Sequence, residues 1–194
     1  MLSLPFSSGA FTTLYADPPW PEVGAGVKGG RRGADRHYPL MAFKEIEAME
    51  SEVRRVSQPN SHLYLWVTNR FLPQGLNVMA AWGYEYRTVI TWGKDRFGLG
   101  QYFRGQSEQC LFGVRGNIPY RVRSDGVRAQ GTTLVLAPRQ EHSQKPEKVR
   151  QMIEVVSPGP YLELFARCSA QGWTAWGNET LGAITLPMGP ASIQ

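Results

Sequence analysis

Short apolar runs rich in β-branched and aromatic residues recur along the chain, separated by stretches whose apolar residues follow helical spacing. Seven such runs predict strands, at residues 12–16, 62–67, 85–92, 109–114, 132–137, 161–165 and 173–178. Helices are predicted over 41–49 and 70–82, and from Pro146 to Val156. Strands that alternate with helices predict an α/β fold, with a mostly parallel sheet covered by helices on both faces.

Three stretches rich in glycine or charge interrupt this pattern, near residues 21–36, 94–107 and 116–131. We predict that they are mobile loops of a single domain spanning residues 1–194, because a chain of 194 residues with 42% hydrophobic content can bury one sizeable core. No apolar run approaches the length of a membrane span, and the start of the chain lacks the features of a secretion signal. The two cysteines give neither a disulfide framework nor a metal site. We therefore expect a cytoplasmic protein that holds no metal and binds no membrane.

The tetrapeptide Asp17-Pro18-Pro19-Trp20 ends the first predicted strand. The proline pair must stop the strand, so a carboxylate and an aromatic ring follow at its C-terminal end, where open α/β sheets bind ligands. Proline carbonyls remain acceptors on a backbone of fixed φ. Asp-Pro alone is typical of an ordinary turn, but all four residues after an apolar strand favour a site that grips an exocyclic amine and stacks on its base.

The exocyclic amine of adenine is a poor nucleophile, because its lone pair is delocalised into the ring. Two acceptors on its hydrogens favour a more tetrahedral nitrogen and stabilise the positive charge that develops during transfer. A methyl sulfonium placed in line then needs mainly positioning. The same turn can serve the N4 amine of cytosine or a glutamine side chain, so the residues alone leave the acceptor open.

Other candidates for binding lie at later strand ends. Lys145 falls between a strand and a helix, where it can meet a ligand carboxylate or remain a solvated loop lysine. Glu163 lies in a late strand and can bind ribose hydroxyls or be a paired, semi-buried acid. The glycine fingerprint of ordinary dinucleotide-binding folds is absent from the sequence.

The net charge of +5 is a mild bias toward polyanions, and its distribution is more informative. One Gly-rich stretch contains Lys28, Arg31, Arg32 and Arg36, and another stretch contains Arg115, Arg121, Arg123 and Arg128. Two basic loops flanking a base pocket favour phosphate contact over simple solvation. The loop over 94–107 adds Tyr102, Phe103 and Arg104.

Over roughly residues 12–180, the chain resembles the adenine-N6 methyltransferases that include the eukaryotic messenger-RNA m6A writer and its bacterial and phage relatives. The shared motifs are Asp17-Pro18-Pro19-Trp20, Tyr38-Pro39-Leu40-Met41, Leu63-Tyr64-Leu65-Trp66-Val67-Thr68, Ile90-Thr91-Trp92-Gly93-Lys94, Glu108-Gln109-Cys110-Leu111-Phe112-Gly113, His142-Ser143-Gln144-Lys145-Pro146, Glu163-Leu164-Phe165-Ala166-Arg167 and Trp176-Gly177-Asn178-Glu179. The resemblance implies a Rossmann-like fold that uses S-adenosylmethionine and releases S-adenosylhomocysteine. It also implies a permuted order, with the catalytic tetrapeptide first and the cofactor strand last.

The resemblance further assigns roles to single residues. It places the tetrapeptide on the target amine, with Asp17 also near the methionine part of the cofactor. On the substrate side it implies Tyr38 in a closing loop, with Trp92 and Glu108 beside the acceptor base. The loops themselves add Arg31, Arg32 and Arg104 as predicted nucleic-acid contacts. The implied cofactor residues are Ser143, Lys145, Glu163, Phe165, Arg167, Asn178 and Glu179.

We therefore predict a methyltransferase acting on N6 of adenine in DNA, with the base flipped from a duplex into the pocket. RNA is the alternative substrate within this class. A non-catalytic subunit that binds nucleic acid beside a partner is the alternative from another class, although such a subunit needs neither Asp17 nor Lys145. A monomer or homodimer is expected, and a partner subunit is compatible with the sequence.

Overall fold

The computed structural model describes residues 3–21, 40–98, 102–118, 121–139 and 144–177. In these ranges one seven-stranded sheet has the order β5-β3-β4-β2-β1-β6-β7. The strands are β1 (Phe11–Ala16), β2 (Ser57–Val67), β3 (Glu85–Gly93), β4 (Ser107–Arg115), β5 (Leu134–Leu136), β6 (Tyr161–Leu164) and β7 (Trp173–Trp176). Each predicted strand is confirmed, with β2 beginning earlier than its apolar run indicated and β5 shorter.

The sheet is mostly parallel, as predicted, with one strand running against its neighbours. β1 pairs in parallel with β2 and β6, β6 with β7, and β3 with β5. β4 is antiparallel to both β2 and β3, with Val67 opposite Gln109 and Trp92 opposite Glu108. The start of β4 therefore lies at the same sheet edge as the C-terminal ends of β2 and β3, which brings Glu108 to the edge where ligands bind.

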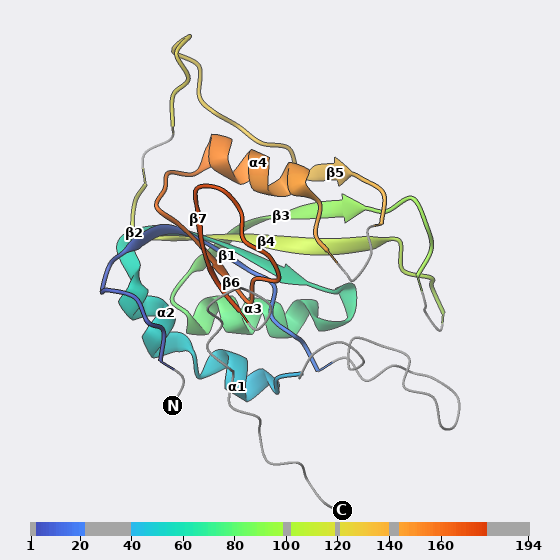
Figure 1. Cartoon of the computed structure of the whole chain (residues 1–194). Coiled ribbons are helices and arrows are strands. Elements are labelled where there is room, and N and C mark those ends of the chain that lie inside the picture. The colour runs from blue at the N-terminus through green and yellow to red at the C-terminus, as the bar shows by residue number, and fades with distance from the viewer. Residues whose placement is uncertain (1–2, 22–39, 99–101, 119–120, 140–143, 178–194) are drawn as a thin grey trace, which may run out of the picture.

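Helices cover both faces of the sheet (Figure 1). One face carries α1 (Phe43–Glu47), α2 (Glu50–Val56) and α3 (Leu72–Ala81), with the short 3₁₀ helix η2 (Asn69–Phe71) before α3, and the other carries α4 (Glu147–Val156). The α/β class and the three predicted helices are confirmed. The sequence prediction missed α2, whose buried residues Val53 and Val56 are flanked by charged side chains that offered little periodic signal.

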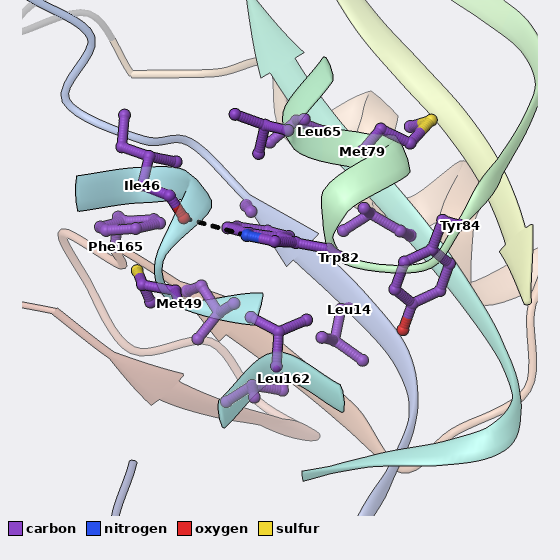
Figure 2. Packing of buried hydrophobic residues seen from close by; sticks show 14 of the residues in the cluster. Leu14, Ile46, Met49, Leu65, Met79, Trp82, Tyr84, Leu162 and Phe165 are labelled. Atoms are coloured by element: carbon purple, nitrogen blue, oxygen red, sulfur yellow. Dashed lines mark hydrogen bonds between the residues drawn. The ribbon is translucent and has the colours of Figure 1, made fainter. Parts of the chain in front are cut away.

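The core beneath α1 to α3 is built from one apolar layer of the sheet and one of the helices (Figure 2). Leu14, Leu65 and Leu162 come from three adjacent strands and are each 0% exposed. Trp82 packs onto them from the end of α3, and its Nε1 donates a hydrogen bond of 3.0 Å to the carbonyl of Ile46. This bond satisfies the indole N–H and ties α3 to α1, so the helical layer supports the sheet edge as one unit.

The basic stretch over 115–128 does not lie beside the predicted base pocket. Arg115 ends β4 and donates to the carbonyl of Ser57 at 2.9 Å, at the start of β2. Arg121 donates to the carbonyl of Ser157 at 3.1 Å, just beyond the last turn of α4. The prediction that this loop flanks the pocket was wrong because β4 runs antiparallel and carries its C-terminal loop to the opposite sheet edge.

Candidate active site

Five charged side chains meet at the sheet edge where β1 ends. Asp17 follows β1, Lys94 follows β3, and Arg167 comes shortly after β6. Glu108 is the second residue of β4, and Lys145 precedes Pro146, the N-cap of α4. These residues come from five separate parts of the chain, so the sheet order alone brings them together.

Their side chains form a chain of ion pairs with alternating sign. Lys145 Nζ lies 2.9 Å from Asp17 Oδ1 and 3.0 Å from Glu108 Oε1. Lys94 Nζ lies 2.8 Å from the other oxygen of Glu108, and Arg167 Nη2 lies 3.2 Å from Asp17 Oδ2. The side chains are between 10% and 23% exposed, so each carboxylate is held between two cations in a partly desolvated cluster of ion pairs.

Burial and pairing act in opposite directions on these groups. Burial by itself lowers the pKa of Lys145, but the negative charges of Asp17 and Glu108 raise it by a larger amount, so the net pKa lies above the ordinary lysine value. For Glu108, burial raises the pKa, and the ammonium groups of Lys145 and Lys94 more than reverse that effect, so the net pKa is lowered. Both groups are therefore ionised at neutral pH.

The tetrapeptide turn differs from the expected one in two respects. Its carbonyls are already engaged, because Pro18 O accepts from Trp20 N at 2.8 Å and Pro19 O accepts from Met41 N at 2.9 Å. The Trp20 ring was expected to stack on the base, which requires it to lie outside the core, and that placement was wrong: it is 6% exposed, and its Nε1 donates to the carbonyl of Trp66 at 2.9 Å. The bond to Met41 brings the start of α1 back over the turn, where Phe43 packs 6.1 Å from the Trp20 ring.

Two further tryptophans lie beneath the two lysines. Trp66 and Trp92 pack edge to face at 6.2 Å, with Lys145 Nζ 5.4 Å from the Trp66 ring and Lys94 Nζ 4.5 Å from the Trp92 ring. Trp92 is 1% exposed, and its Nε1 donates to the carbonyl of Ala137 at 2.8 Å. The Trp92 ring thus contacts Lys94 through a cation–π interaction, and its burial leaves no ring face open to an acceptor base.

A second ion pair joins β6 to α4. Glu163 accepts from Arg150 Nη2 at 2.7 Å, and both side chains are 12% exposed. Burial raises the pKa of Glu163, and the nearby Arg150 guanidinium offsets part of that rise. Of the two interpretations of Glu163, the structure shows the paired acid, while its position beside the sheet edge keeps ribose binding as a prediction.

The backbone that directly follows β6 and β7 is tightly constrained. Phe165, which directly follows β6, has φ of +62° and packs 5.7 Å from the Trp176 ring. A Cβ on Gly177 would lie 2.1 Å from the carbonyl oxygen of Ala166, so only glycine allows this approach of the two chain segments. Two buried donors, Arg150 Nε and Trp176 Nε1, have no hydrogen-bond acceptor among the described residues.

Several predicted site residues fall outside the described residues, and their roles stay predictions. They are Arg31, Arg32, Tyr38, Ser143, Asn178 and Glu179. Arg104 is described, lies in the loop between β3 and β4, and donates to the carbonyl of Gly98 at 3.2 Å. The sequence analysis missed the roles of Lys94 and Arg150. Lys94 stood directly after a strand end, which was a usable signal, whereas Arg150 looked like an ordinary helix-surface charge.

Neither a metal site nor a membrane span was found in the part of the chain that the structure describes. No group of three or more His, Cys, Asp or Glu side chains there could hold a metal ion. No helix there is both long and apolar enough to cross a bilayer.

Comparison with known proteins identifies the family of the chain. The chain is 30% identical over 186 residues to the type II methyltransferase M.MunI of Mycoplasma sp, an alignment that covers 87% of this chain and 77% of that protein. It is 30% identical over 189 residues to the human N(6)-adenosine-methyltransferase catalytic subunit METTL3, covering 90% of this chain and 29% of METTL3. An N(6)-adenosine-methyltransferase MT-A70-like protein of Arabidopsis thaliana is also 30% identical over 189 residues, with 24% of its length covered. The chain thus spans about a quarter of these eukaryotic relatives. The MT-A70 family pattern matches residues 11–179, and the chain belongs to the MT-A70 family.

Proposed function

We propose that this protein transfers the methyl group of S-adenosylmethionine to N6 of adenine in DNA. The observation that carries the proposal is the position of Asp17. Its carboxylate stands at the C-terminal end of β1, 16% exposed, and is held by Lys145 and Arg167 at 2.9 and 3.2 Å. A fixed, anionic acceptor at this edge of a Rossmann-like sheet suits the binding of an exocyclic amine.

The residues present fit the methyl donor. S-adenosylmethionine has a carboxylate, an ammonium group, a sulfonium, a ribose diol and an adenine. Lys145 and Arg167 offer cationic donors for the carboxylate, Asp17 offers an anion for the ammonium group, and Glu163 offers acceptors for the ribose hydroxyls. The unsatisfied donor Trp176 Nε1 lies in the strand next to Glu163. When bound, the donor supplies an electrophilic methyl group.

The chain's own groups then act on the acceptor amine. Asp17 accepts one N–H of the amine, and its negative charge stabilises the positive charge that grows on N6. The carbonyls of Pro18 and Pro19 each accept one backbone hydrogen bond and keep a second lone pair, so one of them can take the other N–H. Asp17 is also the anion placed to receive the proton that N6 loses after methylation. Lys145 and Arg167 hold this carboxylate in position while it binds the amine.

DNA is favoured by the extent of the similarity. The type II methyltransferase is matched over 77% of its length, whereas the human and plant adenosine methyltransferases are matched over 29% and 24% of theirs. The region shared with the adenosine methyltransferases is therefore a part of much longer chains. RNA remains the second candidate, because those relatives are equally identical over the aligned residues.

Nucleoside mass spectrometry tests the proposal. DNA and RNA of matched sequence are incubated with isotope-labelled methyl donor, digested, and examined for labelled N6-methyladenine and N4-methylcytosine. We expect label in N6-methyladenine from DNA.

Asp17→Asn should abolish transfer. The control variant Asp125→Asn, which changes an exposed acid between β4 and β5, should transfer the methyl group like wild type. Activity of Asp17→Asn within about tenfold of wild type, a change near 1.4 kcal/mol, would contradict the role of the carboxylate. Label in N4-methylcytosine would assign a different acceptor, and no donor binding by calorimetry would favour a non-catalytic subunit.

A further inference from the structure

We propose that the connection between β3 and β4 is a base-stacking tip, formed by Phe97, Tyr102, Phe103 and Arg104, that holds unpaired bases of the nucleic acid beside the target adenine. The proposal rests on the proposed function for the identity of the substrate, but it concerns binding and can be tested without turnover. Figure 1 shows the described parts of this connection, residues 94–98 and 102–106, projecting beyond the ends of β3 and β4.

Hydrogen bonds order the part of the connection next to β3 and β4. Lys94 N donates to Gln106 O at 2.9 Å, and Gln106 Nε2 donates back to Lys94 O at 3.0 Å. Further out, Gly98 N donates to Gly105 O at 2.6 Å. These paired bonds continue the β3–β4 ladder past the strands and fix the direction in which the loop leaves the sheet.

The aromatic side chains of the tip are turned to solvent. Tyr102 is 94% exposed, Phe103 is 90% exposed and Phe97 is 58% exposed, and no other large hydrophobic side chain among the described residues exceeds 70%. Adjacent exposed rings of this size leave apolar surface in contact with water, and they contribute nothing to the folded core. A binding partner that covers flat rings explains their exposure.

The charge around the rings favours a nucleic acid as that partner. Arg104 lies with its guanidinium 5.5 Å from the Phe97 ring, and Arg96 is 83% exposed. The acid Asp95 is the single negative side chain in the described part of the connection between Lys94 and Ser107. Rings interleaved with arginine bind bases by stacking and phosphates by charge, and this combination is found where proteins hold single strands.

The tip is joined to the candidate active site through the residues where the connection meets the two strands. Lys94, where the connection begins, is paired at 2.8 Å with Glu108, the second residue of β4. Glu108 in turn contacts Lys145, which contacts Asp17. A nucleotide whose adenine reaches Asp17 therefore has its neighbours close to the tip, where bases that have left the duplex stack can be held.

The test compares two probes with the same phosphates. One is a labelled single-stranded DNA 16-mer of mixed sequence, and the other is an abasic oligomer of the same length. The double variant Tyr102→Ala/Phe103→Ala should bind the 16-mer about tenfold to a hundredfold more weakly and bind the abasic oligomer like wild type. The double variant Tyr102→Phe/Phe103→Tyr should keep wild-type affinity for both. Tyr86→Ala, which removes a 44% exposed ring near the start of β3, is the matched control and should bind both probes normally.

Arg104→Ala separates the charge from the rings. It should weaken both probes and reduce the slope of log affinity against log salt by about one, whereas the ring variants should leave that slope unchanged. Unchanged affinity of the alanine double variant for the 16-mer, or an equal loss on the abasic oligomer, would overturn the stacking role. A change in its sedimentation without a base-dependent loss would also overturn it and assign the tip to protein contact. If wild type binds with this base dependence but methylates no adenine, the proposed function fails while the tip stands.

Discussion

Replacing Lys145 by methionine tests the central ion-pair chain most directly. The side chain is 10% exposed and contacts Asp17 and Glu108 at 2.9 and 3.0 Å, so the substitution removes one cation from two partly buried carboxylates. Breaking a buried pair by removing one partner costs about 3–5 kcal/mol. Each carboxylate keeps a second cation, Arg167 or Lys94, so we expect the lower end, about 3 kcal/mol.

For a chain of this size, about 3 kcal/mol corresponds to a fall in Tm of roughly 6–12 °C. The same substitution removes a charge-assisted donor for the cofactor carboxylate, so the affinity for S-adenosylmethionine should fall by about 1–3 kcal/mol. The two effects are separable, because the first depends on uncompensated negative charge and the second on the missing ammonium group. Differential scanning calorimetry and titration calorimetry measure them on the same samples.

The double variant Lys145→Met/Glu108→Gln provides the decisive comparison. Neutralising Glu108 removes one of the two carboxylates that lost a cation, so the double variant should regain part of the lost Tm and none of the lost donor affinity. A Tm loss equal to the sum of the two single losses would show that the side chains do not interact in solution. An unchanged dissociation constant for the donor in Lys145→Met would refute the cofactor role of Lys145.

Two further predictions concern side chains away from the ion pairs. Trp20→Ala should lower the free energy of unfolding by about 3–5 kcal/mol, as much as Trp66→Ala, because both rings are buried; a Tm near wild type would show that Trp20 is not a core residue. Burial lowers the pKa of His62 to about 4, so the unfolded chain binds more protons between about pH 6.5 and 4 and stability should fall on acidification through that window, by on the order of 3 kcal/mol. Urea denaturation of wild type and His62→Gln at pH 7 and pH 4.5 measures this, and equal losses in both proteins would contradict it.

The parts of the fold that the sequence predicted are those determined locally. Short apolar runs marked each strand, and Pro146 marked the start of α4 because proline is favoured at the beginning of a helix. Asp17 was found for the same reason, since two prolines directly after an apolar strand fix where the strand stops. The end of β2 nearest the site was placed correctly, whereas its beginning at Ser57 includes Pro59 and polar residues that no strand pattern indicates.

The parts that the sequence could not predict depend on pairing between distant segments. The burial of Trp20 follows from the bond between Met41 N and Pro19 O, which brings Phe43 against its ring across a stretch of sequence with no regular pattern. The position of Arg115 depends on the direction of β4, and an apolar run carries no sign of its direction. Local patterns therefore identified which residues are chemically capable but not which of them meet.

The antiparallel direction of β4 also explains how the site holds so much charge. A parallel β4 would carry Glu108 to the far sheet edge and leave Lys94 and Lys145 facing each other with Asp17 as their nearest anion. With β4 reversed, Glu108 lies between the two lysines and lowers the cost of placing both in a partly buried edge. Among the described residues at this edge, three cations then face two carboxylates, and the excess positive charge favours a ligand that brings a carboxylate of its own. The reversed strand thus lets one sheet edge hold Asp17 in place for the amine while Lys145 remains charged for the methyl donor.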